Sequence, residues 1–189
     1  MIWHDPKWWF VILMALAWWF PQNAIHEGSH ALIYKLLGYK ITDLKPYLHR
    51  HTTTDDEGNP LPWYKGWSFA RMWCEWPEDR PVEEKPSQKW RALAVIAPVI
   101  SNTVIFAALY VPTAMSETWL HGVLGGLMIT QLFDAGNNWR FIWRKYRDDS
   151  RSDVWRFIYK SGASHKGMIA FSIGWVVLAV AALAIPVSL

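Results

Sequence analysis

Residues 8–37 read WWFVILMALAWWFPQNAIHEGSHALIYKLL. The first part of this segment is almost wholly apolar, and the second part mixes apolar residues with polar and titratable ones. An α-helix rises ~1.5 Å per residue, so about 20 apolar residues cross the ~30 Å hydrocarbon layer of a bilayer. We therefore predict a membrane helix that is interrupted by Pro21, carries its polar residues in the half that follows, and is capped by Gly38.

Three further apolar segments follow the first one. The predicted spans cover approximately residues 7–38, 90–112, 118–143 and 167–187. No second block of different composition follows that would argue for another domain. We therefore predict a single membrane domain over residues 1–189, an all-α integral membrane protein with about four transmembrane helices. The first segment also lacks a small-residue cleavage site, so we expect it to be mature structure and not a signal peptide.

The polar connections between the spans have patterns of their own. Residues 40–75 alternate between apolar and polar positions around the turn sequence DDEGNP at 55–60, which predicts a β-hairpin of residues 40–53 against 62–74. Residues 75–89 are rich in proline and charge and are expected to form a surface linker. Within residues 140–165, the apolar positions Val154, Trp155, Phe157 and Ile158 favour an amphipathic helix at the membrane interface.

The basic residues predict the orientation of the chain. All but Lys7 of the 19 Lys and Arg residues lie between residues 35 and 91 or between 140 and 166, regions that four crossings place on one face. The positive-inside rule makes that face cytoplasmic, so the hairpin is cytoplasmic and both termini are on the other side. The net charge of +3 thus reflects a lipid bilayer as partner, and we expect no nucleic acid. The single cysteine, Cys74, excludes an internal disulfide and a multi-cysteine metal site.

The first span contains a candidate metal site. His26-Glu27-Gly28-Ser29-His30 places two imidazoles four residues apart on one helical face, close enough to hold a single Zn²⁺. Glu27 follows the first histidine and can take a proton from an activated water molecule. Two histidines and a glutamate inside a membrane helix are costly unless they pair, bind metal or face water. We therefore predict that His26 and His30 are Zn²⁺ ligands and that Glu27 is the catalytic base.

A catalytic zinc usually has a third protein ligand. From residue 92 onward the carboxylates are Glu117, Asp134, Asp148, Asp149 and Asp153. Only Asp134 lies within a predicted span. His26 lies about 27 Å along the helix from Trp8, and Asp134 about 24 Å from Thr118, so the two share a similar depth. His121 would lie about 20 Å too shallow by the same rise. We predict Asp134 as the third ligand.

Three segments resemble one family in the right order. Residues 26–32 (HEGSHAL) with 37–41 (LGYKI) resemble the motif helix of the site-2 protease family of intramembrane zinc metalloproteases. The hairpin resembles the membrane-associated β-loop of that family. Residues 97–102 (APVISN) resemble its Gly-Pro-x-x-Asn segment, and residues 133–136 (FDAG) resemble its Leu-Asp-Gly segment. The resemblance covers about residues 20–140, without a PDZ insertion.

The resemblance implies a function and a set of residue roles. It implies hydrolysis of a peptide bond in a membrane-embedded or juxtamembrane segment of a membrane protein substrate. His26, His30 and Asp134 would bind zinc, Glu27 would act as the base, and Asn102 would contact the substrate or the oxyanion. The chain departs from the family pattern where Ala97 replaces a glycine, where Asn102 lies one residue further from the proline, and where Ala135 separates the aspartate from the glycine.

Two alternatives remain open at this point. The departures, the small size and the 15 tryptophans favour a non-proteolytic metal-binding scaffold or accessory subunit of a larger membrane protein complex. A zinc peptidase of the soluble type, tethered by helices, would instead take a Glu or His outside the spans as its third ligand. The distances among the side chains of His26, His30 and Asp134 discriminate between the second alternative and the intramembrane site.

Overall fold

The structure is a computed structural model that describes residues 8–50, 52–55, 57–68, 70–116, 118–143 and 153–184. In chain order its elements are α1 (Trp8–Leu36), β1 (Lys40–Lys45), β2 (His49–Arg50), β3 (Trp67–Ser68), β4 (Arg71–Glu75), η1 (Val82–Glu84), α2 (Gln88–Met115), α3 (Thr118–Arg140), η2 (Phe141–Trp143), α4 (Asp153–Ser161) and α5 (His165–Ala184). The fold is mostly helical, and a small hairpin follows the first helix, as predicted.

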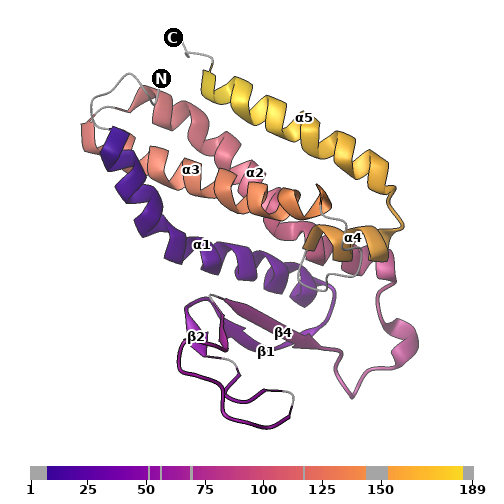
Figure 1. The fold of residues 1–189 in the computed structure, drawn as a ribbon. Coiled ribbons are helices and arrows are strands. Elements are labelled where there is room, and N and C mark those ends of the chain that lie inside the picture. Colours follow the sequence, from indigo (N-terminus) through magenta and orange to yellow (C-terminus); the bar gives the residue numbers. More distant parts are fainter. Residues whose placement is uncertain are drawn as a thin grey trace.

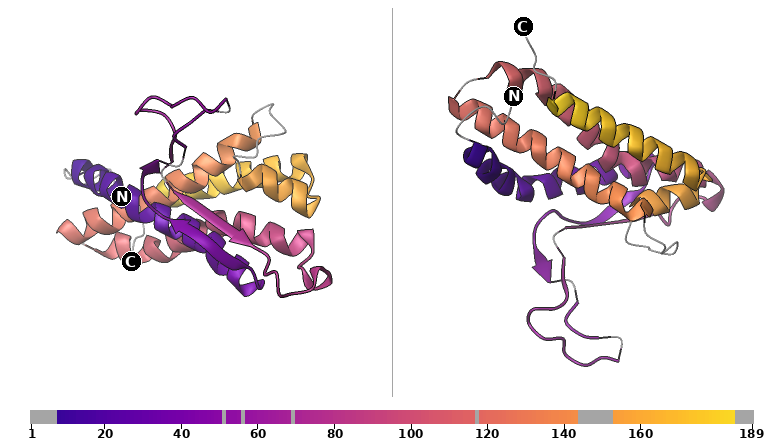
Figure 2. Two further views of the ribbon diagram at one scale, coloured as in Figure 1. Left: turned by 90° about the horizontal axis from the view of Figure 1, so that it is seen from below. Right: turned by 45° about the horizontal axis from the view of Figure 1, so that its top comes forward.

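The four long helices form a bundle, and the strands lie to one side of it. Figure 1 shows α1, α2, α3 and α5 running roughly side by side, with the strands next to α1 and away from α5. Figure 2 shows the loop beyond β2 projecting away from the helices. The ends of the four long helices lie within three residues of the ends of the four predicted segments.

The described residues include one helix that is both long and apolar enough to cross a bilayer, which is α2. The apolar part of α5, His165–Ala181, is shorter. α1 and α3 are long enough, but polar residues and tryptophans within them reduce their hydropathy. The four membrane spans and the side on which the termini lie therefore stay predictions. The structure itself contains one candidate span, α2.

The end of α1 places the hairpin beside the motif. α1 runs through Pro21 and ends at Leu36. Gly38 then adopts φ +88°, and the N–H groups of Gly38 and Tyr39 donate to the carbonyls of Lys35 and Tyr34, each at 3.0 Å. This is the left-handed cap predicted from the sequence. It reverses the chain directly into β1, two turns after His30.

The hairpin pairs as an antiparallel ribbon. β1 pairs with β4, with Lys40 opposite Glu75 and Lys45 opposite Arg71, and a bulge interrupts the ladder between Ile41 and Asp43. β2 and β3 extend the ribbon as a separate short pair. β4 has one strand neighbour among the described residues, so its second edge carries no strand there.

The short helix α4 is the predicted amphipathic helix, but it packs against the bundle. Val154 is fully buried in a cluster with four residues of α2, α3 and η2, namely Ile96, Val99, Trp139 and Ile142. Trp155 is also buried and stacks on His165 at a centroid distance of 4.7 Å. The apolar face of α4 is thus covered by protein. This packing holds Asp153, the first residue of α4, beside α1.

The close crossing of α1 and α3 depends on Gly126. A Cβ added there would lie 2.5 Å from the Cβ of Met14 and 2.8 Å from the backbone nitrogen of Ala15. We expect Gly126→Ala to push the helices apart and to lower the free energy of unfolding by about 1–3 kcal/mol, measured as a lower thermal midpoint in detergent. Gly136→Ala on the same helix is the control, because a Cβ there meets nothing within 4 Å. Equal midpoints for the two variants would contradict the close crossing.

Candidate metal centre

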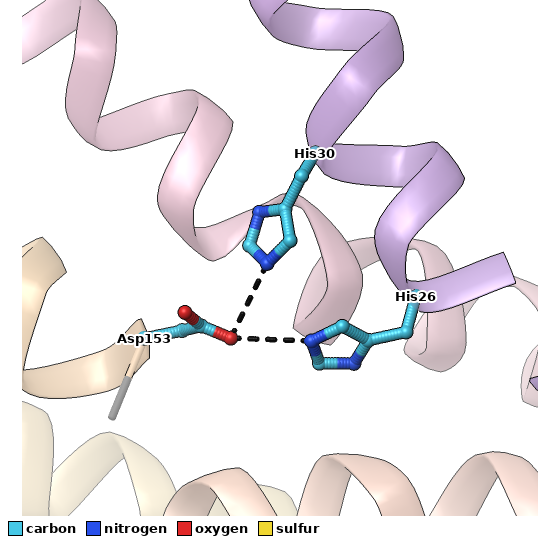
Figure 3. Close-up of side chains that lie close together, drawn as sticks. All are labelled: His26, His30 and Asp153. Atoms are coloured by element: carbon cyan, nitrogen blue, oxygen red, sulfur yellow. Dashed lines mark ion pairs between the residues drawn. The ribbon is translucent and has the colours of Figure 1, made fainter. Parts of the chain in front are cut away.

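Two histidines and one aspartate converge between α1 and α4. The Nε2 atoms of His26 and His30 lie 3.2 and 3.3 Å from the same carboxylate oxygen, Oδ2 of Asp153. Figure 3 shows the carboxylate reaching from α4 toward both rings, which project from successive turns of α1. These three residues form a group that could hold a metal ion. We refer to His26, His30 and Asp153 as the convergent group.

The far side of each imidazole determines which nitrogen can bind a metal. Nδ1 of His30 lies 2.7 Å from the carbonyl oxygen of Ala94, which can only accept, so His30 donates from Nδ1. Nδ1 of His26 lies 2.8 Å from the carboxylate of Asp134 and donates in the same way. In the neutral tautomers both Nε2 atoms therefore present lone pairs toward Asp153. Such outer hydrogen bonds are what orient metal-binding histidines.

The centre of the convergent group needs positive charge. Two lone pairs and a carboxylate oxygen repel one another at 3.2–3.3 Å unless protons or a metal cation lie between them. Ligands at roughly 2.0–2.1 Å from a tetrahedral zinc are about 3.3 Å from each other. The two nitrogen–oxygen distances therefore match two edges of a tetrahedral zinc site, and the three ligand atoms all lie within 4.8 Å of one another.

Asp153 is positioned by the start of α4. It is the first residue of that helix, where the unpaired N–H groups favour a negative charge. Its side chain is 13% exposed. Burial by itself would raise the pKa of Asp153, but when the two Nε2 atoms carry protons their hydrogen bonds to the carboxylate more than offset this and hold its pKa well below the ordinary value. Asp153 is therefore an ionised carboxylate, the form that binds metals.

Asp134, the predicted third ligand, lies on the opposite side of His26. Its Oδ2 accepts from Nδ1 of His26 and from the side-chain amides of Gln22 and Asn102. Gln131 in turn donates to Gln22, so a chain of buried amides supports the carboxylate. The structure thus brings Asp134 to one histidine, whereas Asp153 reaches both. In this arrangement Asp134 orients His26, and direct ligation by Asp134 stays a prediction.

Asn102 is deeply buried and fully engaged. Its side chain donates to Asp134 and accepts from Gln22 at 2.8 Å, and the residue is 1% exposed. It therefore belongs to the amides that hold Asp134. The predicted contact of Asn102 with substrate or oxyanion would require these bonds to break.

Glu27 lies in a cavity together with the convergent group. The cavity encloses about 620 Å³, and its walls are the motif residues of α1, residues 70–74 of the hairpin and the polar face of α4. Glu27 forms no ion pair or hydrogen bond among the described residues, so its carboxylate is free to accept a proton. A water molecule or an extended peptide fits in a space of this size.

His121 lies away from the site, as its shallow predicted position implies. Its Nδ1 donates to the carbonyl oxygen of Thr113 at 2.9 Å, near the turn that joins α2 to α3. It therefore cannot reach the motif histidines, which lie near the other end of the bundle.

Sequence reasoning missed three residues of this site. Asp153 lies outside the predicted spans, but the amphipathic pattern that starts at Val154 indicates that one face of this segment must be covered. Gln22 and Gln131 are amides inside predicted spans, where polar side chains need partners. Pairing these amides with the other polar side chains inside the predicted spans would place them near Asp134.

Comparison of the chain with family models, with curated proteins and with solved structures finds no match. The resemblance to the site-2 protease family therefore rests on the motif residues alone. Any inference of function rests on the geometry of the site.

Proposed function

We propose that the chain is a multi-pass intramembrane zinc metalloprotease that hydrolyses a peptide bond in a membrane-embedded or juxtamembrane segment. The observation that carries this proposal is the convergent group, with Glu27 in the same cavity. Two imidazoles and one carboxylate are a ligand set that catalytic zinc uses, with a fourth position left for water.

The chemistry follows from the positions of the residues. Zinc, when bound, supplies a Lewis acid that polarises the scissile carbonyl. Glu27 takes a proton from the attacking water and returns it to the leaving amine. Asp134 holds the Nδ1 proton of His26, which keeps the Nε2 lone pair directed at the metal position. The Ala94 carbonyl does the same for His30.

The surface of the bundle supports a membrane location. All four long helices expose large apolar side chains, including Leu16 on α1, Val104 on α2, Phe133 on α3 and Leu178 on α5. Apolar surface spread over four helices needs lipid or protein to cover it. The basic residues gather at the hairpin and α4, which favours the cytoplasmic side for the site.

The free edge of β4 supports binding of an extended peptide. Residues 70–74 line the cavity, and β1 occupies only one edge of β4. A peptide that adds to the second edge gains main-chain hydrogen bonds regardless of its sequence. It would then lie between the hairpin and α4, beside the convergent group.

Zinc dependence tests the proposal. The purified chain in proteoliposomes is expected to bind one zinc ion and, mixed with a membrane-protein extract, to create new peptide ends within or next to apolar segments. Chelation with 1,10-phenanthroline should remove the zinc and stop the cleavage, and added Zn²⁺ should restore it. New ends are identified by amino-terminal labelling and mass spectrometry. Zinc-loaded protein that creates no new ends would favour the scaffold alternative.

A further inference from the structure

A second group of charges lines the cavity beyond the convergent group. Asp153, Arg156 and Lys160 lie on one face of α4, at spacings of three and four residues, and all three line the cavity. Arg71 of β4 contributes a further cation on the opposite wall. The cavity thus runs from a metal-binding end to a cationic end.

Lys160 has no acidic partner among the described residues. Its ammonium group lies 3.4 Å from the hydroxyl of Tyr34, a neutral group, and no carboxylate in the described part of the chain forms an ion pair with it. Lys160 is half-buried, and burial, followed by the charges of Arg91 and Arg156, lowers its pKa. A cation in such a place is stabilised by any anion that enters the cavity.

Arg156 also becomes available when a metal is bound. Within the part of the chain that the structure describes, its ion pair is with Asp153, at 3.9 Å. Once the Asp153 carboxylate is shared with a metal cation, its attraction for Arg156 falls. Arg156 and Lys160 then present two donors to the same part of the cavity.

We propose that Arg156 and Lys160 form a subsite for an acidic side chain of the peptide substrate, about three residues from the cleaved bond. This inference rests on the proposed protease function. Seven residues of α4 separate Lys160 from Asp153, which is about 10 Å along the helix. An extended peptide on the free edge of β4 advances roughly 3.3 Å per residue, so about three residues cover that distance.

An anionic lipid headgroup is the competing anion, and the position of the cations argues against it. Arg156 and Lys160 line the same cavity as the convergent group and face the hairpin across it. A peptide bound along residues 70–74 would lie in the cavity that these cations line, beside the convergent group.

Peptide binding tests the subsite without requiring cleavage. Fluorescent decapeptides of alanine and leucine, each with a single Glu moved through the sequence, are titrated onto zinc-loaded Glu27→Gln protein in neutral detergent. We expect the best Glu peptide to bind about tenfold more tightly than its Gln counterpart. Lys160→Ala should abolish that difference and Lys160→Arg should keep it. Lys89→Ala removes an exposed lysine at the start of α2 and should change nothing.

Three results would overturn the subsite. They are equal affinities for the Glu and Gln peptides, binding of none of the peptides, and an equal loss of preference in Lys89→Ala and Lys160→Ala. Equal affinities together with retention of the protein by phosphatidylglycerol vesicles, lost in Lys160→Ala, would assign the cations to lipid. A Glu preference without any zinc-dependent cleavage would keep the subsite and reject the protease function.

Discussion

The Glu27→Gln protein is expected to bind zinc as the wild-type protein does and to cleave no substrate. Glutamine keeps the shape of the side chain but cannot take a proton from water, and a positioned base contributes about 10²–10⁴-fold to such reactions. Glu27 forms no ion pair with the convergent group, so its loss leaves the metal ligands in place. Zinc content is measured on the purified protein, and cleavage by the new peptide ends.

Glu84→Gln is the matched control for this experiment. Glu84 is exposed in η1, outside the site, so the control removes the same charge without changing the chemistry. The control should cleave at the wild-type rate. Wild-type cleavage by Glu27→Gln would refute the base role, whereas absence of cleavage from both the wild-type and the variant protein would favour a metal-binding scaffold.

Asp153→Asn and Asp134→Asn should differ sharply in zinc affinity. If Asp153 is a ligand, its amide variant loses a charged donor, and we expect its affinity to fall by well over 100-fold. Asp134→Asn removes the partner behind His26, a change that typically costs about 10–100-fold. Competition with a fluorescent zinc chelator measures both affinities, at one pH and in one detergent.

The reverse order of affinities would have a clear meaning. Zinc retained by Asp153→Asn and lost by Asp134→Asn would make Asp134 the ligand, as the sequence predicts, with Asp153 filling the metal position in this structure. Asp43→Asn serves as the control, because Asp43 is a carboxylate of the hairpin that pairs with Lys45 and Arg71. It should leave zinc affinity unchanged.

The helices and the hairpin were predictable because their signals are local. Long apolar segments specify helices, and the turn sequence at 55–60 specifies where the ribbon reverses. The position of α4 was not predictable, since an apolar face of this size can be covered equally by lipid or by protein. Its burial against Trp139 and Ile142 depends on contacts between distant segments.

The candidate site also has one part that the sequence predicts and another that it does not. The spacing of His26 and His30 follows from one helical turn, so the sequence alone places both rings on one face. The depth argument places Asp134 next to His26, and the two side chains do lie 2.8 Å apart. The position of Asp153 depends on where α4 packs against the bundle. The positions of the supporting amides Gln22 and Gln131 depend on how α1 and α3 are rotated about their axes. Periodicity does not determine either property.

The location of Asp153 has a consequence for biogenesis. The two histidines lie on α1, whereas the carboxylate that meets them comes after three of the four long helices. A nascent chain that ends before residue 153 contains the base and two imidazoles but cannot complete the convergent group. A metal that needs Asp153 as a ligand could therefore be bound only after α1, α2 and α3 have been made.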